Sequence, residues 1–257
     1  MRKLPSNLVQ RRAGRLKRTL VMSAALLLCG CAKFPNSGGG TGSTRIVVSM
    51  YVAGKIRTGS EQTSGGLPYI YMVAINPTTE ENPIAQGPIP VIGPPWGNGF
   101  VAGQCRFFMW WNPLQFPKYG LYQFQDTLLN QYSLIGTPVI SENITEGVNR
   151  IKFEFDLNQL ITDPNELLTI KALQINFLTM DRIPQVGVEK FWDANGDARS
   201  GLSQDINQPI LISLRTSAVY DNSRAFIKEP ANDVVGANDP DLDIIDWSIE
   251  VRLPQQQ

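Results

Sequence analysis

Residues 45–257 consist of short apolar segments separated by turn-forming residues. In none of these segments do apolar residues recur at helical spacing over three turns. β-Branched and aromatic residues, which favour strands, are concentrated in the segments. Glycine, proline, asparagine and aspartate dominate between them. The expected strands are 45–52, 69–75, 104–111, 121–124, 132–139, 150–155, 173–180, 209–215 and 244–253. Many short strands with tight connections predict an all-β fold, an antiparallel β-sandwich, with a β-barrel-like fold or two small sandwiches as alternatives.

Two of the expected strands alternate strictly between apolar and polar residues. In 150–156, Ile151, Phe153 and Phe155 fall on one face and the charged residues on the other, and 247–253 follows the same pattern. This period of two is typical of strands with one buried and one solvent-facing side. Helix is limited to a few short turns, the clearest beginning at Asp163-Pro164, where a capping residue precedes a first-turn proline.

The N-terminal 31 residues have a different character. Residues 1–30 contain seven basic residues and no acidic one, and an apolar run begins at Leu20. A basic region, an apolar region and small residues at the end are the three parts of a secretory signal. The 11 residues from Leu20 to Gly30 are too few for a membrane-spanning helix, which needs about 20.

The end of this region, Leu28-Cys29-Gly30-Cys31, resembles the lipobox of bacterial lipoproteins. In that family the signal is cut before the cysteine, which then carries a diacylglycerol and usually a third acyl chain. The resemblance implies a signal peptide over 1–30, lipidation (including palmitate) at Cys31 and a place in the bacterial cell envelope. With Ala32 rather than aspartate next, the outer membrane is favoured in a two-membraned organism. Residues 31–44 then form a lipidated glycine- and serine-rich tether, and 45–257 the β-rich domain.

Net charge and amino-acid composition limit the classes of function that the chain can have. Without the signal the chain keeps 16 basic and 23 acidic residues, a net charge of −7. This charge argues against nucleic acid as a partner, because phosphate binding needs clustered basic residues. The chain has no histidine, which excludes Ser–His and Cys–His catalysis and imidazole metal sites. An enzyme is therefore disfavoured, although carboxylate chemistry stays open, and Cys105, in an apolar run, is expected to be a buried thiol.

One segment predicts a metal site. Asp193-Ala-Asn-Gly-Asp197 resembles the opening of EF-hand-like and dockerin-like calcium loops at Asp193, Asn195 and Asp197, and oxygen ligands are those that Ca²⁺ prefers. The resemblance does not extend to the rest of the loop, because Ala198 and Gln204 stand where those loops have glycine and glutamate. The alternative is a polar hairpin turn at Asn195-Gly196. Calcium is the one cofactor that the sequence indicates.

Aromatic residues supply a second set of candidates. The strand 104–111 has apolar residues on both faces, so Phe108 and Trp110 need cover. The proline- and glycine-rich loop 84–100, with Trp96 as an apolar plug, a second sheet, a partner protein or a sugar ring could provide it. Trp96 and Trp110 are accordingly the candidate ligand-binding residues, although large aromatic residues are mostly core material.

The acidic segment 239–243, with Asp246, could complete a cation site, form a carboxylate pair for hydrolysis, or be a solvated loop. Together these features predict a membrane-anchored envelope lipoprotein with a non-catalytic structural or binding domain, whose partner is an envelope protein or a glycan. The alternatives are a carbohydrate-binding module and a hydrolase of envelope or extracellular polysaccharide that uses carboxylates such as Asp193, Asp197 or Asp241.

Overall fold

The computed structural model describes residues 43–59, 69–84, 86–90, 97–182, 190–200 and 208–254. The chain divides into two compact units, Met1–Gly39 and Gly40–Gln257, and every described residue lies in the second. The predicted signal peptide and Cys31 therefore lie outside the described residues.

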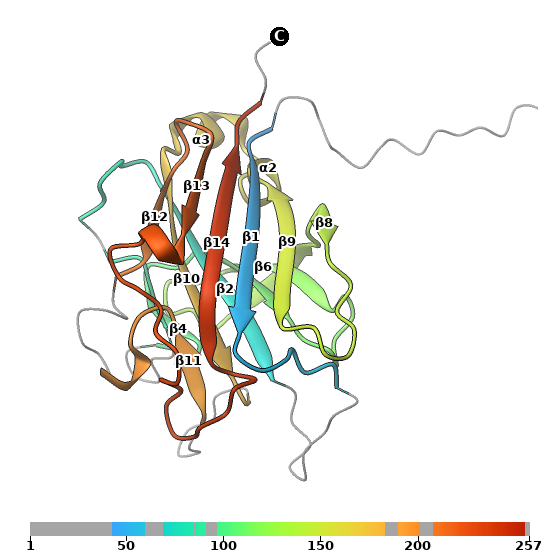
Figure 1. Cartoon of the computed structure of the whole chain (residues 1–257). Coiled ribbons are helices and arrows are strands. Elements are labelled where there is room, and N and C mark those ends of the chain that lie inside the picture. The colour runs from blue at the N-terminus through green and yellow to red at the C-terminus, as the bar shows by residue number, and fades with distance from the viewer. Residues whose placement is uncertain are drawn as a thin grey trace, which may run out of the picture. The chain divides into compact units, whose positions relative to one another are not determined.

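Most of the strands belong to two antiparallel sheets (Figure 1). Sheet A runs in the order β13 (Ala218–Asp221), β14 (Ile244–Arg252), β1 (Arg45–Val52), β9 (Arg150–Asp156) and β8 (Ile140–Ser141). Sheet B runs in the order β11 (Trp192–Ala194), β10 (Ala172–Met180), β2 (Ile70–Thr78), β5 (Phe107–Trp111), β6 (Tyr119–Phe124) and β7 (Tyr132–Gly136), with β12 (Ile210–Ser213) also paired to β10. A small third sheet joins β3 (Pro88–Pro90) and β4 (Val101–Gly103).

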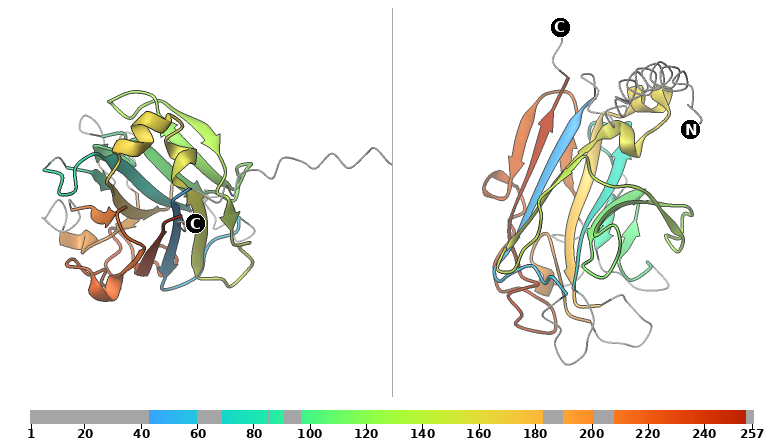
Figure 2. Two further views of the ribbon diagram at one scale, coloured as in Figure 1. Left: turned by 90° about the horizontal axis from the view of Figure 1, so that it is seen from above. Right: turned by 90° about the vertical axis from the view of Figure 1, so that its right-hand side faces the viewer.

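The main core lies between sheets A and B, which form two layers in Figure 2. Alternate residues of each strand point into it, among them Val48 and Phe153 from sheet A and Val73 from sheet B. Trp247 of β14 stacks on Phe177 of β10 with ring centroids 5.7 Å apart. This arrangement confirms the predicted antiparallel β-sandwich, and the alternation of 150–156 and 247–253 is what supplies its inward faces.

Sheet B has a second apolar cluster on its outer face, as the two apolar faces of the segment 104–111 predict. Phe108 stacks on Tyr122 at 4.9 Å, and Trp110 meets the edge of Phe100 at 5.8 Å. Cys105 joins this cluster as a buried free thiol, which confirms the prediction, and its burial raises the pKa to about 12.

Some boundaries differ from those expected. β2 continues through Asn76-Pro77 to Thr78, because only β10 pairs with it beyond Ile75 and the proline therefore has a free side. The helical turn is confirmed: α3 (Pro164–Thr169) begins at Asp163, whose side chain accepts the Asn165 N–H at 2.8 Å. A second helical turn, α2 (Leu157–Leu160), follows β9.

Candidate functional site

The candidate site lies at the edge of sheet B, where β11 meets a distant part of the chain. Asp193 of β11 pairs with Thr179 of β10. Gly196, just beyond β11, has φ of +95°, a backbone conformation that suits glycine, and a short 3₁₀ turn, η1 (Ala198–Ser200), follows. The segment 229–235 returns alongside, and the Val235 N–H donates to the Trp192 carbonyl at 2.8 Å.

Three buried carboxylates converge here. Asp193, Glu229 and Asp233 each place one oxygen within 4.8 Å of the others. Their exposed fractions are 0%, 5% and 3%. Residues some 40 positions apart thus form one acidic cluster, which we call the carboxylate cluster.

Backbone N–H groups hold the carboxylate cluster in place. Three alternate residues donate to its three members: Ala194 to Asp193 Oδ1 at 2.8 Å, Gly196 to Glu229 Oε2 at 2.7 Å and Ala198 to Asp233 Oδ2 at 2.9 Å. Ile244, the first residue of β14, donates to the other oxygen of Asp193 at 2.6 Å. The cluster therefore joins the edge of sheet B, the segment 229–233 and the start of a sheet A strand.

The electrostatics of the cluster disfavour three bare negative charges. Burial, followed by the charge of Asp233, raises the pKa of Asp193 well above its ordinary value. Burial and the two neighbouring carboxylates do the same for Glu229, and burial raises the pKa of Asp233 to about 6. Within the described ranges, no lysine or arginine forms an ion pair with any of the three.

The structure brings together only part of the predicted calcium loop. Asp193 belongs to the carboxylate cluster, but Asp197 does not, because its Oδ1 accepts the N–H of Arg199 at 3.1 Å in a tight local turn. Glu229 and Asp233 lie there instead, and neither was predicted. Asn195 is buried, at 1% exposure, and borders a neighbouring cavity.

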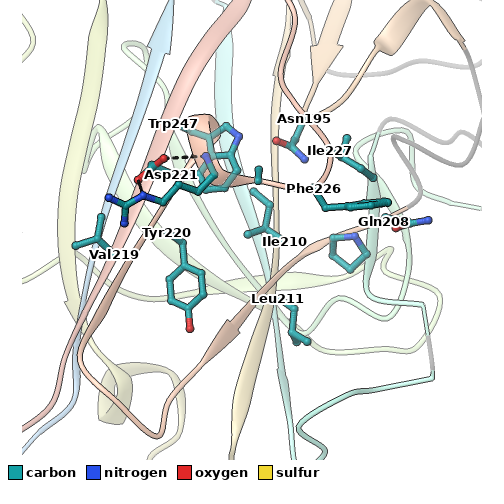
Figure 3. A pocket seen from close by; sticks show the side chains of 13 residues that line it. Asn195, Gln208, Ile210, Leu211, Val219, Tyr220, Asp221, Phe226, Ile227 and Trp247 are labelled. Atoms are coloured by element: carbon teal, nitrogen blue, oxygen red, sulfur yellow. Dashed lines mark hydrogen bonds and ion pairs between the residues drawn. The ribbon is translucent and has the colours of Figure 1, made fainter.

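This cavity, of about 490 Å³, opens between the edge strands of the two sheets (Figure 3). Its walls come from β12, β13, the segment 224–227 and β14; the lining residues are Asn195, Gln208, Pro209, Ile210, Leu211, Val219, Tyr220, Asp221, Arg224, Ala225, Phe226, Ile227 and Trp247. The Ser213 N–H donates to the Tyr220 hydroxyl at 3.0 Å and so ties β12 to β13. Phe226, at the rim, is 96% exposed.

Two residues that line the cavity each bury a polar atom that has no hydrogen-bond partner in the part of the chain that the structure describes. These atoms are the indole N–H of Trp247, a donor, and Oδ1 of Asn195, an acceptor. Buried polar groups are almost always paired, so each of these atoms needs an explanation. Both atoms are enclosed by protein, so they lie behind the cavity surface and out of reach of a ligand in the cavity.

Of the two predicted ligand-binding tryptophans, the structure describes Trp110, which does not line this cavity. Trp110 is 1% exposed and packs inside the outer cluster of sheet B, where its Nε1–H donates to Gln115 Oε1 at 2.9 Å. Its ring has no surface to offer a ligand, because the aromatic residues around it already cover it. Trp96 lies outside the described residues, and so does the proposed plug.

The acidic segment 239–243 is not a solvated loop, which was one of the three possibilities that its sequence left open. Asp241 is 6% exposed, and its carboxylate pairs with Arg57. Asp239 accepts the Tyr69 hydroxyl, and Asp243 Oδ1 accepts the Asn232 N–H at 2.7 Å. Asp241 and Asp243 are themselves buried, and their hydrogen bonds join the segment 239–243 to neighbouring segments of the chain.

Comparison with known proteins gives no relative: no family model matches the chain, and neither a curated protein nor a solved structure is significantly similar to it. Among the residues that the structure describes, no helix has the length and apolar character to cross a membrane. What the fold and the site define is thus an all-β sandwich with a buried carboxylate cluster beside a cavity.

Proposed function

We propose that the chain is a lipid-anchored bacterial envelope protein whose β-sandwich binds a carbohydrate without altering it. The observation that carries this proposal is the cavity of about 490 Å³, whose lining combines the exposed ring of Phe226 with the polar side chains of Gln208 and Asp221. The anchor rests on the resemblance of Leu28-Cys29-Gly30-Cys31 to a lipobox. The tether up to residue 44 would let the domain reach its ligand away from the membrane.

A sugar matches the chemistry of the cavity. A hydroxyl group both donates and accepts, so sugar hydroxyls can pair with the amide of Gln208 and the carboxylate of Asp221. The remaining wall is largely apolar, with Ile210, Tyr220 and Phe226 among its residues, and aromatic rings pack well against the C–H face of a sugar. The volume of about 490 Å³ lies within the ordinary range for small-molecule sites.

Binding without hydrolysis is favoured by the acidic residues. Glycoside hydrolysis uses two carboxylates about 5–10 Å apart on either side of the bond to be cut. Among the described residues that line the cavity, Asp221 is the single carboxylate, and Arg224 pairs with it at 3.6 Å. The carboxylate cluster is buried, where its oxygens do not face a polysaccharide.

The test is a glycan array with the full-length protein in detergent, followed by titration calorimetry on the best ligand. Phe226→Ala and Gln208→Ala are each expected to weaken binding about tenfold, the effect of losing one stacking contact or one hydrogen bond. Phe116→Ala, which removes a fully exposed phenylalanine outside the cavity wall, is the matched control and should bind like wild type. The proposal is wrong if no glycan binds, or if both cavity variants bind as tightly as wild type.

A further inference from the structure

The carboxylate cluster lacks the positive charge that its environment requires. Asp193, Glu229 and Asp233 are buried within 4.8 Å of one another, and a fourth buried acid, Asp243, adds its charge to all three. Burying an unpaired carboxylate is costly, and like charges at this separation add to that cost. Over the described parts of the chain no basic side chain offsets them, so either a bound cation or shared protons must reduce the negative charge.

A second observation shows where a cation would bind. Glu229 and Asp233 each use one oxygen for a backbone N–H, whereas Glu229 Oε1 and Asp233 Oδ1 are buried without a partner among the described residues. Buried carboxylate oxygens are normally hydrogen-bonded or bound to a metal. These two oxygens therefore have lone pairs available to bind a cation, and they belong to a group of acids that the fold already holds together.

We propose that Asp193, Glu229 and Asp233 bind one divalent cation, calcium. The three donors are all carboxylate oxygens, which hard cations prefer, and the sequence has no histidine to favour a transition metal. Two positive charges offset most of the three negative ones. Calcium takes about six to eight oxygens, so water and backbone carbonyls would complete the shell.

The role of the cation is to fasten the edge of the sandwich. Its three ligands come from β11 and from the segment 229–233, and Asp193 is also bonded to the first residue of β14. A single ion would therefore hold the edge of sheet B to the segment that leads into sheet A. This inference does not rest on carbohydrate binding, and its test needs no sugar.

Full-length protein in detergent, stripped with EGTA, is the material for the test. Calcium at about a hundredfold excess over its dissociation constant is expected to raise the melting temperature by about 5–10 °C, and calorimetry should show one site per chain. Glu229→Gln and Asp233→Asn keep the side-chain size and remove a ligand charge. Each should abolish the calcium-dependent shift, and each should melt above the stripped wild type because repulsion is relieved.

Asp197→Asn is the matched control, since Asp197 lies in the same loop but outside the cluster; it should retain the full shift. If Asp197→Asn loses the shift, calcium binds the predicted linear loop instead. A shift with magnesium and none with calcium overturns the assignment to calcium. If the wild type shows neither a shift nor binding heat with either ion, the cluster holds shared protons and the proposal fails.

Discussion

Cys31→Ser is expected to release the protein from membranes and to abolish incorporation of labelled palmitate. The thiol of Cys31 is the predicted site of the diacylglycerol, and each buried methylene of an acyl chain contributes about 0.8 kcal/mol to membrane binding. The net charge of −7 after residue 30 provides no electrostatic attraction to an anionic membrane surface. Fractionation of cells grown with labelled palmitate measures both effects together.

Cys29→Ser is the matched control for this experiment. Cys29 lies within the predicted signal and leaves with it, so the variant should stay lipidated and membrane-bound. Cys105 is buried in the outer cluster of sheet B and is not available for acylation in the folded domain. A Cys31→Ser protein that still carries palmitate and sediments with membranes would show that the lipobox interpretation is wrong.

The sequence predicts the sandwich because its long strands carry their own pattern. The alternating residues of 150–156 become β9, and their apolar members face the main core. The short strands β3, β8, β11 and β13 were not predicted as strands, because two to four residues are too few to show a period. Such strands are determined by their neighbours: β11 exists because β10 offers it a partner, which the local sequence does not record.

The candidate site, like the fold, is predicted where it depends on local sequence and missed where it depends on long-range contacts. Asp193 was predicted from a local spacing, whereas Glu229 and Asp233 reach it through long-range contacts such as the pairing of Trp192 with Val235. The segment from 221 to 243 is acidic and rich in turn-forming residues, a composition typical of surface loops. The adjacent valines, Val234 and Val235, were a signal that Asp233 is buried, because two apolar residues in such a segment favour the interior.

The cavity was also missed, since it depends on where two edge strands end rather than on a motif. Trp247 was correctly placed on the inward face of β14, but nothing in its spacing indicates that its N–H would lack a partner. Phe226 is an isolated aromatic in a polar segment, and only the position of β12 opposite β13 gives it a place at a rim. Sites of this kind follow from tertiary packing, which the sequence pattern alone does not specify.

Trp110→Ala is expected to lower the free energy of unfolding by about 3–5 kcal/mol, the usual cost of removing a large aromatic from a core. Trp110 is 1% exposed, lies 5.8 Å from Phe100 and 5.4 Å from Tyr122, and donates its N–H to Gln115. Its loss would leave a cavity that the rings fixed on β5 and β6 cannot fill, and would remove the hydrogen bond to Gln115. Urea denaturation followed by circular dichroism gives the value.

Phe226→Ala is the matched control, because it removes an aromatic ring that is 96% exposed; its stability should change by less than about 0.5 kcal/mol. Because both variants lose an aromatic ring, a difference between their free energies of unfolding reports the burial of the ring at Trp110. A cost below about 1 kcal/mol for Trp110→Ala would mean that the outer face of sheet B is not a sealed core. In that case the ring would be accessible at equilibrium, and Trp110 would regain the ligand-binding role that its sequence first indicated.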